Sequence, residues 1–98
     1  MNARPIISLH IFTVKPGDFD ALVERATEAS REASALAGFV SINICGNATH
    51  TKILIASQWK SEEAWSRTQW DEQIGIAVTD LIEGSQADEF ELYWQIGP

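Results

Sequence analysis

Cysteine is almost absent from the sequence, because Cys45 is the only one among 98 residues. A lone thiol cannot form an internal disulfide, and no other side chain that binds zinc is near it in the sequence. We therefore expect Cys45 to be a small apolar core residue in a reduced, cytoplasmic protein that holds no metal.

Basic residues are scarce as well, since seven Lys and Arg stand against 14 Asp and Glu and give a formal net charge of −7. The cations are scattered along the chain, whereas a phosphate backbone or an anionic lipid surface requires clustered Lys and Arg. No apolar run is long enough to span a membrane, and the first residues lack the pattern of a secretion signal. We expect no nucleic-acid partner, no membrane partner and a cytoplasmic location.

Catalytic motifs that can be recognised from sequence alone are missing too. The chain has no glycine-rich phosphate loop, no GxSxG, no HExxH and no cluster of Cys and His. Its hydrophobic fraction of 45% and charged fraction of 21% are nevertheless those of a globular protein, and residues 1–98 fit one domain. Any chemistry must therefore come from polar side chains within apolar strands and from aromatic residues.

Apolar periodicity predicts four strands and two helical regions. Alternating side chains mark the strands, and apolar residues three or four apart mark the helices. The first helix is expected to begin after Asp18 and to end before Gly38. The second region is expected to begin after Ser61, to bend near residues 70–73 and to end at Gly84. The expected strands are residues 6–14, 39–45, 51–59 and 88–96.

The resulting order, βαββαβ, is that of an α+β ferredoxin-like domain, in which helices cover one face of a four-stranded antiparallel sheet. Bulky side chains occur on both faces of the expected strands, since Phe12 lies opposite Ile11 and Leu54 opposite Ile55. A bare sheet face of this kind would be a large exposed apolar patch, so we predict a homodimer formed sheet against sheet. The alternative is a monomer with scattered exposed apolar side chains.

His10 is the leading candidate for a catalytic residue, because it lies between Leu9 and Ile11 in the first strand. A buried imidazole can act as a base near neutral pH, and the alternative is a structural histidine in the core or at the dimer face. Periodicity does not tell which face His10 occupies, because a shift of one residue exchanges the two faces. Asn43, in the second strand, is a candidate donor to a substrate oxygen or a residue that only satisfies its neighbours.

Four tryptophans are many for a chain of 98 residues. Trp59 ends the third strand and Trp65 begins the second helical region, so both can form flat walls of a pocket for an aromatic ligand. The alternative is that they belong to the ordinary core. Trp94 is expected in the core or at the interface.

Residues 12–22 (FTVKPGDFDAL), Gly38-Phe39 and above all residues 57–65 (SQWKSEEAW) resemble the antibiotic biosynthesis monooxygenase family, and the resemblance covers nearly the whole chain. It implies a homodimer of the dimeric α/β-barrel superfamily, whose C-terminal strand reaches toward the partner. It also implies oxygenation of phenols, anthrones or quinols without metal or flavin. In that scheme the pocket deprotonates an aromatic, the anion passes an electron to O2, and the radical pair recombines.

Individual family positions transfer unevenly to this chain. The family tryptophan matches Trp59, and Trp65 stands where the polyketide-tailoring members have tyrosine. Ile55 stands where they have asparagine, so one hydrogen-bond donor is missing. His10 takes the place of a pocket asparagine of the haem-degrading branch, and the haem-ligating histidine of that branch would fall near Val78. Haem degradation is therefore not expected.

Three functions remain open. The first is a cofactor-independent monooxygenase that oxidises a small aromatic or quinol with O2, with His10 as base or hydrogen-bond partner and Trp59 and Trp65 as walls. The second is an isomerase or another small-molecule enzyme, because the fold does not determine the reaction. The third is a non-catalytic ligand-binding or structural dimer. An enclosed polar contact at His10 would favour an enzyme, and a pocket filled by its own side chains would favour the third function.

Overall fold

Strand β1 (Ile6–Val14) lies in the middle of the sheet, between two antiparallel neighbours. The computed structural model describes residues 3–97 of the chain. β1 pairs with β3 (Lys52–Trp59) on one side and with β4 (Ile82–Glu91) on the other, and β2 (Phe39–Gly46) pairs with β3. The strand order β2-β3-β1-β4 is that of a ferredoxin-like fold, which confirms the predicted fold class.

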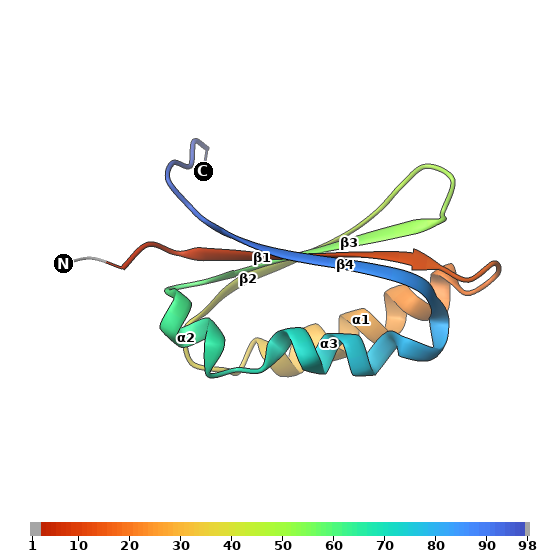
Figure 1. Ribbon diagram of the computed structural model, residues 1–98, viewed down its shortest axis with the longest axis horizontal. Coiled ribbons are helices and arrows are strands. Elements are labelled where there is room, and N and C mark those ends of the chain that lie inside the picture. Colours follow the sequence, from red (N-terminus) through yellow and green to blue (C-terminus); the bar gives the residue numbers. More distant parts are fainter. Residues whose placement is uncertain (1–2, 98) are drawn as a thin grey trace.

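Within residues 3–97, three helices cover one face of this sheet. Figure 1 shows α1 (Phe19–Ala33) and α3 (Trp70–Val78) side by side beneath the strands, with α2 (Glu62–Ser66) at one end. Each large apolar side chain buried between these layers stabilises the fold by roughly 1.5–3 kcal/mol. The large apolar side chains that are fully buried are Phe12, Leu22, Ile53, Ile55, Trp59, Trp70, Ile74 and Val78.

The helices end earlier than the sequence predicted. α1 ends at Ala33, although a helix up to residue 37 was expected, because the chain tightens there into turns. In these turns the Leu36 amide donates to the carbonyl of Ala33, three residues back. At the start of α2 the expected cap is present, since the Ser61 hydroxyl accepts from the Ala64 amide at 3.1 Å.

The last strand was predicted wrongly at both ends. α3 ends at Val78, a short 3-10 turn η1 (Thr79–Leu81) follows, and β4 already begins at Ile82. Gly84, expected to end the helix, lies within β4 beside a shift in the pairing with β1, where a missing side chain is tolerated. β1 begins at Ile6, which pairs with Glu91, so residues 92–96 lie outside the strand. Just beyond this pair the Leu92 amide still donates to the carbonyl of Pro5, which as a proline has no N–H to donate back.

The face of the sheet opposite the helices is uncovered and apolar. Cys45 lies there and is exposed, so the expectation that it belongs to the core was wrong. No helix among residues 3–97 is long and apolar enough to cross a membrane. The partly buried or exposed apolar side chains that share this face are Ile7, Leu9, Ile11, Leu54, Ala56 and Phe90.

Candidate active site

His10 lies on the helix-covered face of the sheet, which answers the question that the sequence left open. Its side chain is 5% exposed, and its neighbours across the sheet are Ile55 on β3 and Ala87 on β4. The imidazole is held on a central strand, where neighbours on both sides restrict its movement. A polar ring in this position requires a polar partner, because burying an unsatisfied polar group is unfavourable.

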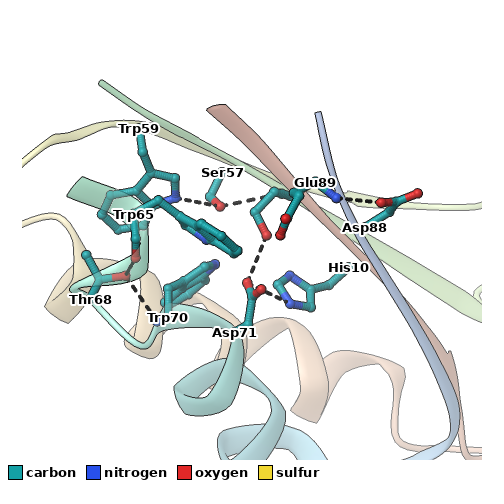
Figure 2. Close-up of polar contacts among 10 residues, drawn as sticks. His10, Ser57, Trp59, Trp65, Thr68, Trp70, Asp71, Asp88 and Glu89 are labelled. Carbon is teal, nitrogen blue, oxygen red and sulfur yellow. Dashed lines mark hydrogen bonds and ion pairs between the residues drawn. The ribbon is translucent and has the colours of Figure 1, made fainter. Parts of the chain in front are cut away.

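Asp71 is that partner, and it comes from the first turn of α3. Its Oδ1 lies 3.2 Å from His10 Nε2, and the same oxygen accepts a hydrogen bond from Ser8 Oγ at 2.8 Å. Figure 2 shows the carboxylate between the ring of His10 and the indole rings of Trp65 and Trp70. Because the Ser8 hydroxyl donates to Asp71 and not to His10, this cluster does not form an activated serine nucleophile.

The carboxyl group of Asp71 keeps its charge although it is half-buried. Burial raises its pKa, but the hydrogen bonds from His10 and Ser8 and the attraction to His10 together outweigh burial and hold the pKa below its ordinary value. The N-terminal end of α3 favours the same negative charge. In a neutral imidazole, a charged oxygen 3.2 Å from Nε2 favours the tautomer with the proton on that nitrogen, which leaves the lone pair on Nδ1.

The tryptophans differ in how their indole N–H groups are used. Trp59 is fully buried, and its N–H donates to Ser57 Oγ at 2.9 Å. Trp70 is also buried, with its ring 6.5 Å from that of Trp59, and Trp65 is half-buried beside it. The indole nitrogens of Trp65 and Trp70 are buried and have no hydrogen-bond partner in good geometry among residues 3–97, although the Trp65 indole approaches the Asp71 carboxylate as a donor and helps to lower its pKa.

Two backbone features position Trp65, Trp70 and Asp71. Gly38 has a positive φ of 87°, and a Cβ there would lie 2.5 Å from the Ala64 Cβ, so only glycine lets α2 approach the sheet this closely. Gln69, between α2 and α3, has a left-handed φ of 56°. Such a conformation is unfavourable for a residue with a side chain, and it turns the chain sharply just before Trp70.

The other predicted site residues are not brought to this cluster. Asn43 is exposed and pairs with Ala56 on the opposite face of the sheet from His10. Trp94 is 78% exposed and does not belong to the core, so of its two expected places only the interface stays a prediction. Of the predicted residues, His10 and Trp65 lie on opposite sides of the Asp71 carboxylate in Figure 2, and Trp59 lies farther from His10, with its N–H donated to Ser57.

Sequence reasoning missed Asp71, Ser8 and Trp70 as members of the cluster. The signal available was the interruption of the apolar helical pattern near residue 70, where an acidic residue follows a tryptophan. A carboxylate at the start of a helix is common, so this signal alone does not point to His10, which is far away in the sequence. Among residues 3–97, no group of three or more His, Cys, Asp or Glu side chains could hold a metal ion.

Comparisons with known proteins agree with this architecture. Solved structures with the same fold include a putative antibiotic biosynthesis monooxygenase from Nitrosomonas europaea, with 13% identity and a TM-score of 0.82 over 99% of this chain and 98% of that one. A heme-degrading protein from Mycobacterium tuberculosis has 20% identity and a TM-score of 0.75 over 99% of this chain and 100% of that one. At these identities the likeness shows the fold alone.

No curated protein sequence matches the chain significantly. The family model described as "Antibiotic biosynthesis monooxygenase" matches residues 5–72, which include β1, β3, His10 and Asp71. This match spans well over half of the chain and both halves of the polar cluster. The chain therefore belongs to the antibiotic biosynthesis monooxygenase family.

Proposed function

We propose that the protein is a cofactor-independent monooxygenase that oxidises a small aromatic substrate bearing a ring hydroxyl with O2. The observation that carries this proposal is the buried contact of His10 Nε2 with the charged Asp71 carboxylate at 3.2 Å. A general base near neutral pH has to be oriented by a third group, and Asp71 does this for His10. Membership of the family supports the oxygenase class but not a particular substrate.

Proton transfer from the ring hydroxyl to His10 Nδ1 is the first step. The imidazolium that forms lies against Asp71, so the new positive charge is neutralised where it appears. The net charge of the site does not change, because the proton moves from the substrate to the imidazole without leaving the protein. The side chain of His10 is only 5% exposed, so water competes little for the same proton.

The substrate itself supplies the electrons for the oxygen chemistry. Its anion passes one electron to O2, and the substrate radical combines with superoxide at a ring carbon to form a carbon–oxygen bond. In a substrate with a ring CH2 group, the peroxide takes back a proton and loses water, and the CH2 becomes a carbonyl. One oxygen atom of O2 stays in the product and the other leaves as water, so no external reductant is required.

Access to His10 is expected from the side of β4. The Asp71 side chain is 39% exposed, and Ala87 and Glu89, which lie across from His10 and Ser8, are exposed on the same face. A surface hollow of about 310 Å³ lies at the Ile6 and Glu91 end of these two strands, beside the start of α2. The exposure of Asp71, Ala87 and Glu89 supports entry between β4 and the helix layer.

A homodimer is part of the proposal. The uncovered sheet face carries Leu9, Ile11 and Leu54, and Phe90 extends it to β4, where 48% of that residue is exposed. Beyond β4, Tyr93, Trp94 and Ile96 are at least two-thirds exposed. A second copy packed sheet against sheet would bury these apolar groups. Each Å² of apolar surface buried in this way would stabilise the dimer by about 25 cal/mol.

A proton-transferring isomerase is the second candidate. The His10–Asp71 pair is sufficient for removing a proton next to a carbonyl, and this reaction needs no O2. The two candidates share the base and differ in whether oxygen is consumed. Oxygen uptake therefore separates them.

The deciding experiment is oxygen uptake by the purified protein with a panel of anthrones and hydroquinones. We expect uptake above the rate without enzyme, lost in His10→Ala and retained in His50→Ala, which removes the exposed histidine of the β2–β3 hairpin. With an anthrone, one O2 is consumed per product and no hydrogen peroxide accumulates. Uptake that survives His10→Ala would remove the base from the proposal, and no uptake with any member would leave the isomerase or a binding role.

A further inference from the structure

The nitrogens around Asp71 form an incomplete hydrogen-bonding set. Trp65 Nε1, Trp70 Nε1 and His10 Nδ1 are buried and have no hydrogen-bond partner among residues 3–97, and His10 Nε2 has only its 3.2 Å contact with Asp71 Oδ1. In Figure 2 the two indole rings lie on one side of the Asp71 carboxylate and the imidazole lies on the other. Two donors and one acceptor, all unused, thus surround one charged group.

Unpaired buried N–H groups lower stability, so folded proteins rarely keep two of them together without a reason. Trp59 shows that this fold can satisfy an indole where the ring is only structural, because its N–H donates to Ser57 Oγ at 2.9 Å. The contrast is sharp, since Trp59 and Trp70 are equally buried and their ring centres are 6.5 Å apart. Packing in the core alone therefore does not explain why the N–H groups of Trp65 and Trp70 stay free.

The unused atoms define the chemistry of that ligand. Indole N–H groups only donate, so they require an oxygen with free lone pairs. His10 Nδ1, with its proton held on the other nitrogen by Asp71, requires a hydroxyl hydrogen. A ring hydroxyl offers both, because it donates one hydrogen and still accepts at its oxygen.

We infer that the N–H groups of Trp65 and Trp70 bind the substrate oxygen that His10 deprotonates, and that they select aromatic hydroxyl compounds over apolar rings of the same shape. This inference rests on the proposed function for the identity of the base. When the proton moves to His10, the oxygen becomes negative and its hydrogen bonds to the two indoles become stronger. The indoles thereby stabilise the anion without adding a charge to the site.

Binding without turnover tests the inference. We would follow the four indole signals in ¹H–¹⁵N spectra, assigned with single Trp→Phe variants, while adding 1-naphthol or 1-methylnaphthalene under argon. We expect 1-naphthol to move the Trp65 and Trp70 N–H signals downfield and 1-methylnaphthalene to leave their hydrogen bonding unchanged. We expect the wild type to bind 1-naphthol about tenfold or more tightly than 1-methylnaphthalene, because a hydrogen bond to a partly charged oxygen strengthens binding by about this factor.

Variants separate hydrogen bonding from packing. Trp65→Phe is expected to reduce the preference for 1-naphthol severalfold while binding of 1-methylnaphthalene changes little. Trp70→Phe should do the same, and because this ring is fully buried its fold is first checked by circular dichroism. Trp59→Phe is the matched buried control, whose preference ratio should stay at the wild-type value because its N–H is already donated to Ser57. Trp94→Phe, on an exposed ring, controls for the loss of any indole.

Two results would overturn the inference. One is a set of Trp65 and Trp70 signals that does not move while 1-naphthol binds. The other is an unchanged preference ratio in Trp65→Phe. Neither result depends on oxygen. If the indoles bind 1-naphthol but the protein takes up no oxygen, the inference stands as a binding property and the oxygenase is rejected. Oxygen uptake together with indole signals that do not move would support the oxygenase and reject the role of the two indoles.

Discussion

Replacement of Asp71 with Asn keeps the shape of the side chain and removes the charge that orients His10. The amide can present an N–H to His10 Nε2, which then becomes the acceptor, and the imidazole proton moves to Nδ1. The nitrogen that is expected to take the substrate proton is thereby blocked. A positioned general base contributes about 10²–10⁴-fold to a rate, so we expect kcat to fall by about 10²–10³-fold at pH 7.

The effect of Asp71→Asn on stability is expected to be much smaller. Hydrogen bonds from Ser8 and His10 to a charged oxygen are weakened, but the cost of half-burying that charge is removed as well. The side chain is 39% exposed, so we expect a net loss of about 1 kcal/mol in the free energy of unfolding. In a domain of this size that corresponds to a fall of roughly 4–8 °C in Tm.

The assay is oxygen uptake across pH 5 to 9 alongside thermal unfolding. Asp80→Asn is the matched control, since Asp80 also has a lowered pKa because Arg25 binds it, but it is exposed in the turn η1 that follows α3. We expect Asp80→Asn to keep the activity and pH profile of the wild type. An Asp71→Asn protein that folds and keeps its rate would refute the idea that the carboxylate orients the base.

Further predictions concern stability and assembly. Because the pKa of Asp71 is lowered in the folded protein, its charge stabilises the fold at neutral pH. Urea unfolding should therefore show that the difference in unfolding free energy between wild type and Asp71→Asn shrinks as the pH falls through and below the ordinary aspartate pKa of 3.8. If the proposed dimer forms sheet against sheet, Leu9→Glu on the uncovered face should make the protein monomeric in light scattering, and a persisting dimer would place the interface elsewhere. Ile55→Ala, at a fully buried position, should cost about 2–5 kcal/mol in the same urea assay. Ser61→Ala should cost about 1 kcal/mol, and no change would mean that the cap of α2 is not needed.

The fold could be predicted from sequence because its strands alternate and its first helix has a clear apolar stripe. The last strand was misplaced for a physical reason. Apolar and polar side chains alternate more strongly in residues 88–96 than in residues 82–87. The ends of β4 are nevertheless determined by the backbone groups that β1 offers for pairing. Position along a neighbouring strand overrides local propensity, and a single sequence does not show where that neighbour begins.

The candidate site was only half visible in the sequence. His10 could be found because an imidazole between Leu9 and Ile11 is conspicuous, but both faces of β1 are apolar enough to be buried. Its partner, Asp71, comes from a helix far along the chain, and one sequence gives no measure of that contact. The role of Trp59 illustrates the same limit, since only the structure shows that Ser57 occupies its N–H.

The left-handed residue between α2 and α3 decides which way two tryptophans face. In an uninterrupted helix, residues five positions apart are rotated by about 140° around the axis, so Trp65 and Trp70 would point to different sides. The turn at Gln69 cancels this rotation and brings both rings to the Asp71 carboxylate. The direction of the two indoles thus depends on the left-handed backbone conformation of a single residue, Gln69. A relative with a continuous helix at this place would lose the paired donors even if it kept every side chain.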